Sequence, residues 1–193
     1  MSATNRGSER RPNDYYATPA WCVRALLKTV QLPGGRWLEP AAGDGAIIRA
    51  VLERRRDVSF AACDIDETHR PSLENAGAAL IRIDDFVRLE RYEPVPVIPY
   101  YQVVITNPPF SQSLEFAEAA LRRAPVVVML LRLNWLASQK RNWFLLDNPP
   151  SVYVLPRRPS FTDDGKTDAT DYAWFVWGMG APTVQVIDSE VCR

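Results

Sequence analysis

Short apolar segments alternate with amphipathic segments along most of this chain, and this alternation restricts its fold more than any other feature. Strands are predicted at residues 37–39, 58–63, 80–83, 102–106, 126–131, 152–154 and 172–177. The last two are expected to form a hairpin-like pair around a loop at residues 156–171. Helices are predicted at residues 19–30, 46–56, 69–76, 114–123 and 137–146. Thr18 is predicted to cap the first of them, with Pro19 at the first helical position. Strands that alternate with helices predict an α/β fold with a mainly parallel sheet.

Two regions lie outside this pattern. Residues 1–13 are polar, contain several arginines and lack the apolar core of a secretory signal, so we expect a flexible N-terminal arm. Pro94, Pro96 and Pro99 predict an irregular segment at residues 90–99, because proline fixes φ and removes a backbone donor. Residues 14–193 contain no linker or repeat, and we expect them to form a single domain.

The composition argues against several classes of protein. No apolar run approaches the ~20 residues of a membrane helix, so no membrane contact is expected. The three cysteines are scattered, which argues against a disulfide framework and indicates a cytoplasmic location. With one histidine and no Cys-x-x-Cys pair, no metal site is expected. The formal net charge is zero, which gives no general support for nucleic-acid binding. However, 20 of the 23 basic residues are arginine, which binds phosphate well.

A turn rich in small residues follows the first predicted strand and precedes a helix. It reads Glu39, Pro40, Ala41, Ala42, Gly43, Asp44 and Gly45. Glycine permits positive φ, small residues let a ligand approach the backbone, and the amides at a helix start can face a carboxylate or a ribose. Because tight turns also need glycine for local reasons, the turn alone leaves both interpretations open.

Acidic residues end the next two predicted strands. Asp64 follows the glycines by about twenty residues, where a carboxylate can accept both ribose hydroxyls of an adenosyl cofactor, and Asp66 is the alternative. Asp85 can accept from the adenine amine and Phe86 can pack on its ring, with Asp84 as the alternative to Asp85. Each of these residues is also compatible with an ordinary solvated strand end.

A sharper motif, Asn107-Pro108-Pro109-Phe110, follows the strand predicted at residues 102–106. Two successive prolines give a rigid turn. An arylamine is a poor nucleophile because its lone pair is delocalised. The Asn107 side-chain oxygen and the Pro108 carbonyl can accept its two N–H bonds, which favours a tetrahedral nitrogen aimed at a sulfonium methyl group. Phe110 can stack on the base, and a plain Pro-Pro turn is the alternative.

Taken in order, these motifs resemble those of amino-directed DNA methyltransferases, most closely the compact adenine-N6 enzymes of phages and prophages. The resemblance covers residues 14–177 and implies a Rossmann-like class I sheet of about seven strands, with the last strand antiparallel and helices on both faces. It implies S-adenosyl-L-methionine (SAM) as cofactor and S-adenosyl-L-homocysteine as product. The implied cofactor residues are Tyr16, Thr18, Pro19, Glu39, Pro40, Ala41, Gly43, Gly45, Asp64, Ile65, Asp85, Phe86 and Asn107.

The resemblance also places the chemistry and the target base. Asn107, Pro108 and Phe110 match the catalytic motif, and Pro109 and Phe110 border the base. Phe161 matches a later loop in which an aromatic residue meets the flipped base, because an extruded base needs both faces covered. Beside it, Arg157 and Arg158 can hold phosphates, although both positions also suit packing or loop charge.

The sequence leaves alternatives to a DNA substrate. The Asn-Pro-Pro-Phe motif also suits methylation of adenine or guanine in RNA, and less well that of a glutamine amide in a protein. A SAM-binding protein without catalysis is a further alternative. Restriction-type relatives carry a large target-recognition domain, whereas only about forty residues separate the fifth and last predicted strands here.

Overall fold

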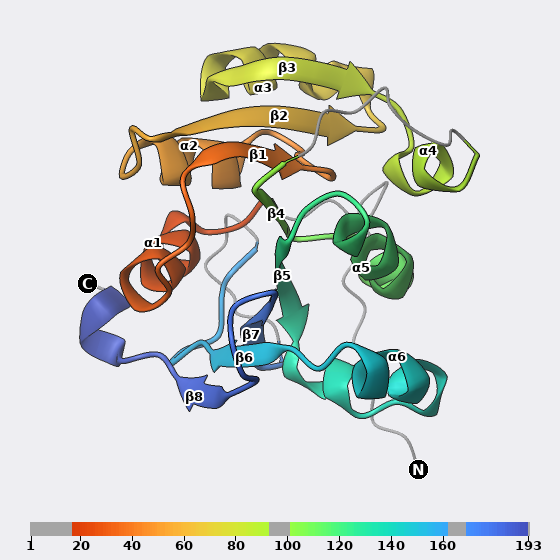
Figure 1. The fold of residues 1–193 in the computed structure, drawn as a ribbon. Helices are drawn as coiled ribbons and strands as arrows, with labels where there is room; N and C mark the ends of the chain where they lie inside the picture. Colours follow the sequence, from red (N-terminus) through yellow and green to blue (C-terminus); the bar gives the residue numbers. More distant parts are fainter. Residues whose placement is uncertain (1–16, 93–100, 162–168, 193) are drawn as a thin grey trace.

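Eight strands form one sheet in the computed structural model, which describes residues 17–92, 101–161 and 169–192 (Figure 1). The N-terminal arm predicted for residues 1–13 and Tyr16 lie outside the described residues. The strands are β1 (Gly35–Glu39), β2 (Val58–Asp64), β3 (Ala78–Ile83), β4 (Val103–Thr106), β5 (Val126–Arg132), β6 (Ser151–Val154), β7 (Tyr172–Trp177) and β8 (Val184–Val186).

The sheet has the order β3-β2-β1-β4-β5-β7-β6-β8. The first five strands pair in parallel, whereas β7 is antiparallel to both of its neighbours, β5 and β6. This arrangement confirms the predicted α/β fold with a mainly parallel sheet and the predicted pairing of residues 152–154 with 172–177. The structure adds β8, which pairs in parallel with β6 at the sheet edge, so the antiparallel strand is not the last one in the chain.

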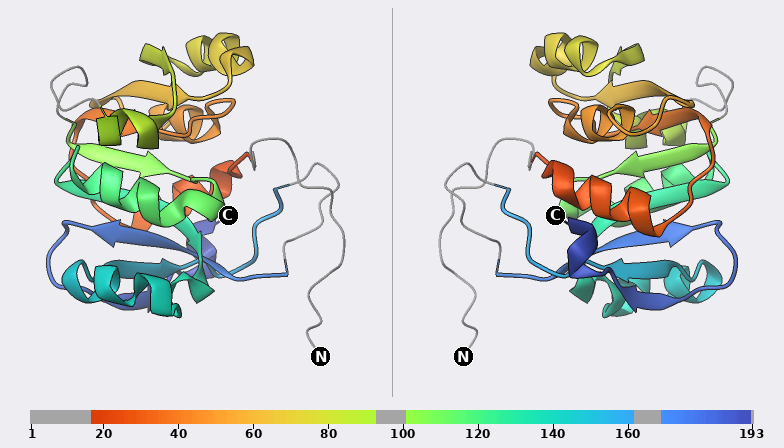
Figure 2. Two further views of the ribbon diagram at one scale, coloured as in Figure 1. Left: turned by 90° about the vertical axis from the view of Figure 1, so that its right-hand side faces the viewer. Right: turned by 90° about the vertical axis from the view of Figure 1, so that its left-hand side faces the viewer.

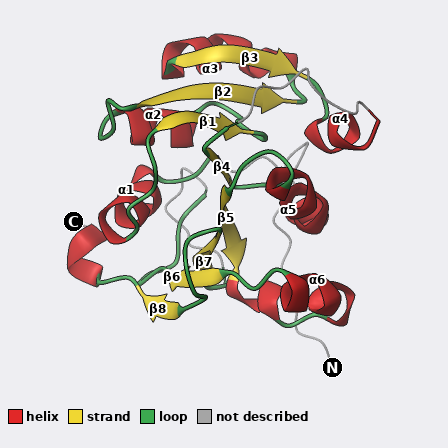
Figure 3. Ribbon diagram, viewed as in Figure 1, coloured by secondary structure: helices red, strands yellow, loops and turns green. Residues whose placement is uncertain are grey.

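Helices cover both faces of the sheet (Figures 1 and 3). In Figure 1, α1 lies on one side together with the C-terminal turn η6, and α4, α5 and α6 lie on the other. The α-helices are α1 (Ala20–Thr29), α2 (Ala46–Leu52), α3 (Arg70–Ala76), α4 (Phe86–Tyr92), α5 (Ser113–Leu121) and α6 (Asn142–Asp147). Short 3-10 turns are η2 (Glu67–His69), η3 (Phe110–Gln112), η4 (Leu133–Leu136), η5 (Gln139–Arg141) and η6 (Ser189–Cys192). None of the described helices is long and apolar enough to cross a membrane.

Two apolar layers hold the helices against the sheet. One layer includes Leu26 of α1 and Ile48 of α2, and the other includes Phe116 of α5 and Phe144 of α6. The central strands β4 and β5 contribute to both layers, and all of their residues except Arg132 are buried. The continuous apolar run predicted at residues 126–131 is therefore a strand covered on both faces (Figure 2).

Several helix boundaries differ from the predictions. Thr18 does not cap α1: Pro19 occupies the N-cap position, and the Thr18 side chain is buried. The predicted helix at residues 46–56 ends at Leu52, and the one at residues 137–146 is replaced by η5 and the shorter α6. No helix was predicted at α4, because the prolines that follow it hid its short helical pattern, and α4 extends into the first three residues of the segment predicted to be irregular. Residues 93–100 lie outside the described residues.

The turn between β7 and β8 contains two glycines whose backbone conformation is unfavourable for other residues. Gly178 and Gly180 both have positive φ, at 82° and 70°. A Cβ at Gly178 would collide with the carbonyl oxygen of Pro125, whereas a Cβ at Gly180 would meet open space.

We expect Gly180→Ala to lower the free energy of unfolding by about 1–2 kcal/mol, the cost of left-handed backbone alone. Gly178→Ala adds a backbone collision and should cost more than about 3 kcal/mol. Urea denaturation of the two variants measures the difference, and equal losses would contradict the role of the Pro125 contact.

Candidate functional site

A cavity of about 330 Å³ lies where the carboxyl ends of β1, β2, β3 and β4 meet. This edge of an open parallel sheet is the usual place for a ligand. Most residues predicted to bind the cofactor line the cavity, together with Pro109: Thr18, Glu39, Pro40, Ala41, Asp64, Ile65, Asp85, Phe86 and Asn107. Pro19, Gly43 and Gly45 lie beside it but do not line it.

The turn after β1 is shaped by two glycines in the left-handed region. Gly43 has a φ of 52° and Gly45 has a φ of 78°, and Gly45 is the N-cap of α2. A Cβ at Gly45 would lie 2.6 Å from the Cβ of Ala76 in α3. Both glycines therefore supply the left-handed backbone of this turn, and Gly45 also permits close packing against α3.

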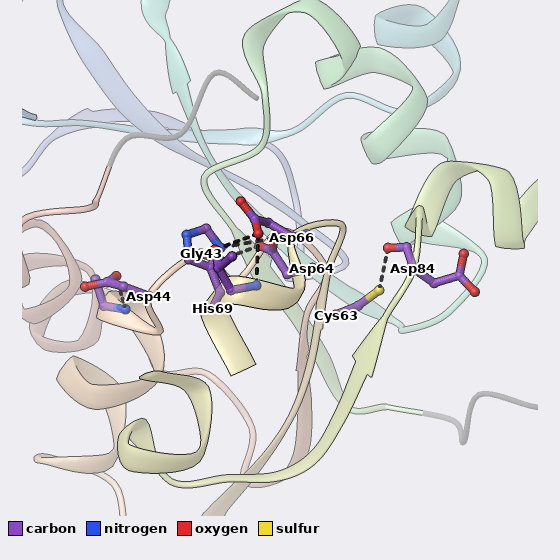
Figure 4. A network of polar contacts seen from close by, with 9 residues as sticks. Gly43, Asp44, Cys63, Asp64, Asp66, His69 and Asp84 are labelled. Carbon is purple, nitrogen blue, oxygen red and sulfur yellow. Dashed lines mark hydrogen bonds and ion pairs between the residues drawn. The ribbon is translucent and has the colours of Figure 1, made fainter. Parts of the chain in front are cut away.

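Asp64 ties the end of β2 to this turn (Figure 4). Its Oδ2 accepts a hydrogen bond from the Gly43 amide at 2.6 Å, and its Oδ1 accepts from the Asp66 amide at 2.9 Å. The Nδ1 of His69 lies 3.2 Å from the same Oδ1. A carboxylate offers about four acceptor positions, so these contacts occupy about three of them.

Asp66 lies next to Asp64 and is more exposed. It is the N-cap of η2, and its Oδ1 accepts from the amide and the hydroxyl of Thr68 within that turn. These hydrogen bonds, from the side chain and then the backbone of Thr68, lower the pKa of Asp66. Asp66 also lines the cavity, so a ligand can reach both carboxylates.

Glu39 is the last residue of β1 and is only 2% exposed. Its Oε2 has no hydrogen-bond partner among the described residues. Burial raises the pKa of Glu39 well above the ordinary value, and the negative charges of Asp44 and Asp64 raise it further. A hydrogen bond from the Ile48 backbone and the charge of Arg49 oppose this shift. The carboxyl therefore stays protonated at pH values where an exposed glutamic acid is ionised.

Asp84 and Asp85 lie between β3 and α4 and have different surroundings. Asp84 accepts hydrogen bonds from Arg82, Arg88 and the Asp85 amide. Desolvation raises the pKa of Asp84, but these hydrogen bonds lower it more. Asp85 accepts from the Arg88 amide at 3.0 Å and thus holds the first turn of α4. Phe86 is buried 5.7 Å from the ring of Phe116, and both rings line the cavity.

The Asn-Pro-Pro-Phe motif follows β4 at the same sheet edge. The side-chain oxygen of Asn107 is buried, and Asn107 and Pro109 line the cavity. Pro108 is buried without lining it. Phe110 begins η3 and lies on the other side of the motif, with its ring centroid 5.9 Å from that of Tyr172 in β7. The motif therefore connects the cavity to a separate group of aromatic side chains.

The residues predicted to meet a base gather near Tyr172. The ring of Phe161 lies 5.1 Å from that of Tyr172, so Phe110 and Phe161 contact the same buried tyrosine. Arg157 and Arg158 are exposed but already have contacts within the protein. The guanidinium of Arg157 lies 4.5 Å from the centre of the Trp21 ring, and Arg158 donates to Asp171 at 2.8 Å.

The structure adds residues that the sequence analysis did not assign to the site. His69, predicted only as the first residue of a helix, contacts Asp64 and lines the cavity. Gln112 and Phe116 also line the cavity, from η3 and α5, the two elements that follow the motif. Tyr172 joins the aromatic group only because β7 pairs with β5, which local sequence does not reveal.

No family model matches this sequence, and no curated protein matches it. Its structure does match those of solved methyltransferases. A protein of Pyrococcus horikoshii that is assigned as an RNA methyltransferase has 15% identity over 86% of this chain and 87% of its own, with a TM-score of 0.62. One of Agrobacterium tumefaciens, assigned as an O-methyltransferase, has 18% identity over 86% and 85%, with a TM-score of 0.60.

The 23S rRNA methyltransferase ErmE has 14% identity over 87% of this chain and 71% of its own, with a TM-score of 0.61. The chain has the methyltransferase fold. Because these identities are low, the likeness shows the fold of this protein and not its substrate.

The raised pKa of Glu39 predicts how stability depends on pH. Since the folded-state pKa lies above the unfolded value, wild-type stability falls as pH rises from the ordinary carboxyl range toward the raised pKa. Glu39→Gln cannot ionise, so its stability relative to wild type should rise by up to about 1.4 kcal/mol for each pH unit in that range. Urea denaturation between about pH 5 and about pH 8 measures this, and a constant difference would show that Glu39 ionises normally.

Proposed function

We propose that this protein transfers a methyl group from SAM to the N6 amine of adenine in DNA. The observation that carries the proposal is the meeting of two sets of residues in one cavity. Asn107 and Pro109 of the Asn-Pro-Pro-Phe motif line it together with Glu39 and Asp64, which end β1 and β2. A methyl donor in the cavity would therefore lie next to the motif that suits an amine acceptor.

The charges of the cavity fit a cationic cofactor. Its lining includes six carboxyl groups, and no group of three or more of the described His, Cys, Asp and Glu residues could hold a metal ion. The carboxyl groups are Glu39, Asp44, Asp64, Asp66, Asp84 and Asp85. When bound, SAM supplies an electrophilic methyl group on a positively charged sulfur.

We assign different parts of SAM to different residues of the cavity. The unpartnered Oε2 of Glu39 suits the cofactor's ammonium group, which would ionise the carboxyl and release its proton. Asp64 has about one acceptor position left, so we assign the ribose hydroxyls to Asp64 and Asp66 together. Asp85 and the Phe86 ring border the place for the adenine, with Ile65 on the exposed side.

The acceptor amine is positioned by the motif after β4. The Asn107 side-chain oxygen and the Pro108 carbonyl accept its two N–H bonds, which localises the nitrogen lone pair and directs it at the methyl carbon. With SAM bound, Asn107 and Pro108 would hold the amine so that an N–C bond could form as the S–C bond breaks, and the nitrogen would then lose its proton to solvent. Phe110 and Phe161, which both contact Tyr172, are the two aromatic side chains that would cover the faces of an extruded base.

RNA is the second candidate substrate. Two of the structural neighbours are described as RNA methyltransferases, one of them the 23S rRNA enzyme ErmE. The motif chemistry requires an amino group held by two acceptors and fits adenine in either nucleic acid. We favour DNA because the order and the residues of the motifs resemble those of the adenine-N6 DNA methyltransferases.

The deciding experiment measures transfer of labelled methyl groups from SAM to unmethylated DNA and, in parallel, to unmodified bulk RNA, followed by nucleoside mass spectrometry. We expect N6-methyladenine in DNA. Label in RNA alone would show that the substrate is RNA and not DNA, and the proposed chemistry of the site would stand. If neither substrate is labelled while calorimetry shows SAM binding, the proposed reaction is wrong.

Asn107→Ala separates chemistry from cofactor binding. We expect transfer to fall by at least about 100-fold, the scale of losing a positioned catalytic hydrogen bond, while SAM affinity measured by calorimetry changes little. Asn107→Asp, which keeps an acceptor oxygen, should retain more activity than Asn107→Ala. Near wild-type turnover in Asn107→Ala would contradict the role given to its side-chain oxygen.

Asp64 and Asp66 should differ in what their removal costs. Asp64→Ala leaves the buried Gly43 amide without its acceptor, so we expect a loss of about 1–3 kcal/mol in unfolding free energy without any ligand, and weaker SAM binding. Asp66→Ala removes only a turn contact at the surface and should cost less than about 1 kcal/mol of stability, while also weakening SAM binding. Unchanged SAM affinity in either variant would remove that residue from the ribose site.

A further inference from the structure

The segment between β5 and β6 exposes several apolar side chains. Of the seven large apolar side chains that are exposed in the described parts of the chain, three lie within residues 136–146. They are Leu136, Trp143 and Leu146, which are 39%, 52% and 72% exposed. Single exposed apolar residues need no explanation, but a concentration of them marks a binding surface. We call these three residues and the exposed Lys140 the α6 surface.

Hydrogen bonds and ring contacts connect this segment to the Asn-Pro-Pro-Phe motif. Ser113 begins α5, and its hydroxyl donates to the Phe110 carbonyl at 3.1 Å. The buried Trp135 of η4 donates from its Nε1 to the same hydroxyl at 2.9 Å. The ring of Trp135 lies 6.1 Å from that of Phe144, which lies 5.9 Å from that of Trp143. Trp143 is therefore two ring contacts away from a residue that is bonded to the motif segment.

Helix α6 has a buried side and an exposed side. Phe144 is buried in the apolar layer that includes α5, whereas Trp143 and Leu146, three residues apart, are exposed. Arg141 precedes the helix, and its Nε donates to the Trp135 carbonyl at 2.9 Å. The guanidinium of Arg141 also lies 5.1 Å from the centre of the Trp135 ring. These contacts anchor the start of α6 to η4, so the exposed Trp143 stands on a fixed helix.

The charge of this segment differs from that of the neighbouring cavity. Residues 133–146 include Lys140 and Arg141 and contain no Asp or Glu. The cavity is lined by six carboxyl groups, which repel phosphates. A nucleic-acid strand that brings a base to the motif therefore meets less repulsion along α6 than across the cavity. Aromatic rings together with cations are the usual means by which proteins bind single strands.

We propose that the α6 surface binds unpaired nucleotides of the strand that carries the target base. The ring of Trp143 stacks on a base of that strand, Lys140 contacts a phosphate, and the two leucines add apolar contact area. The proposal rests on the nucleic-acid substrate proposed above, and it adds that this substrate is single-stranded. A base inside a duplex has both faces covered by its neighbours, so only an unpaired base can offer a face to an exposed ring.

The first test compares single strands with a duplex. Fluorescence anisotropy measures binding of a fluorescein-labelled, mixed-sequence single-stranded DNA oligonucleotide, its duplex and the matching RNA strand to the full chain in excess S-adenosyl-L-homocysteine. Wild type should bind a single strand at least about 5-fold more tightly than the duplex, the scale of stacking one base on an aromatic ring. A duplex that binds as tightly as both single strands would overturn the proposal.

Variants of Trp143 test the stacking contact itself. Trp143→Ala should weaken binding of the single strand by about 5-fold or more, whereas Trp143→Phe, which keeps a ring, should lose less. Because no charge is removed, Trp143→Ala should keep the wild-type slope of log affinity against log salt. Dependence on Trp143 with either the DNA or the RNA strand supports the proposal, and wild-type affinity of Trp143→Ala for both strands would overturn it.

Variants of Lys140 test the phosphate contact. Lys140→Met should make the salt slope shallower by about 0.7, the loss of one phosphate contact on a single strand, and Lys140→Arg should keep the slope. The matched control is Arg56→Met, which removes an exposed arginine just before β2, at the opposite end of the strands from the cavity. The control should leave the slope unchanged. Equal slopes for wild type and Lys140→Met would overturn the role given to Lys140.

Intrinsic fluorescence shows where the strand lies, since a base stacked on a tryptophan quenches its emission. An unlabelled single strand should quench wild type, and Trp143→Phe should remove most of the quenching. The control is Trp21→Phe in α1, which removes a half-buried tryptophan that contacts Arg157. Quenching that is lost in Trp21→Phe and kept in Trp143→Phe would place the strand at α1 and overturn the proposal.

A second copy of the chain is the other possible occupant of the α6 surface. Sedimentation velocity of wild type and Trp143→Ala should give the same oligomeric state. A wild-type dimer that Trp143→Ala dissociates, with unchanged affinity for single strands, would make the surface a protein interface and overturn the proposal.

These tests separate the proposal from the proposed reaction. If wild type transfers no label to DNA or RNA but binds single strands through Trp143 and Lys140, the methyl-transfer function fails and the role of the α6 surface stands. If label is transferred and binding depends on neither residue, the function stands and the role of the α6 surface fails.

Discussion

The carboxylate of Asp64 is the interaction on which the cavity depends. Beyond the ladder of β1 and β2, a backbone hydrogen bond from the Ala42 amide to the Cys63 carbonyl links the turn after β1 to β2, and side chains supply the remaining contacts. Asp64 holds the Gly43 amide, the Asp66 amide and the ring of His69 at once. Because its side chain is only 10% exposed, these bonds form in a weakly screened setting. The side chain of one residue thus links the turn after β1 to the segment that contains η2.

The aromatic group around Tyr172 is built on a different principle. The cavity belongs to the parallel part of the sheet, whereas Phe110 meets Arg132 and Tyr172 only because β7 runs antiparallel beside β5. The strand that breaks the parallel order thereby supplies the aromatic surface, and the strands that keep that order supply the acidic cavity. The Asn-Pro-Pro-Phe segment borders both, with Asn107 and Pro109 on one side and Phe110 on the other.

Sequence was sufficient where a residue's role depends on its own segment. The strands, the glycine turn after β1 and the acids that end β2 and β3 are local patterns, and most of the residues predicted from them line one cavity. Local pattern failed at Thr18, whose position before a proline suggested a cap but which the structure buries in the cavity wall.

Other features depend on contacts between distant segments. Arg132 and Tyr172 are forty residues apart and meet through strand pairing, which no periodicity encodes. The raised pKa of Glu39 has causes that the strand sequence alone does not show. They are the burial of its carboxyl group and the negative charges of Asp44 and Asp64. A residue's role can be assigned only from the structure when it depends on how strands pair or on how deeply the side chain is buried.

The last strand, β8, affects whether this protein associates with other molecules through the edge of its sheet. Its residues are exposed at the edge of the sheet, and Val184 and Val186 are 71% and 68% exposed. An open apolar edge can recruit a strand from another molecule and start aggregation. Here the edge is three residues long, Pro182 comes just before it, and Asp188 begins the turn that follows it. The shortness of β8, more than its composition, is what keeps this edge from serving as a template.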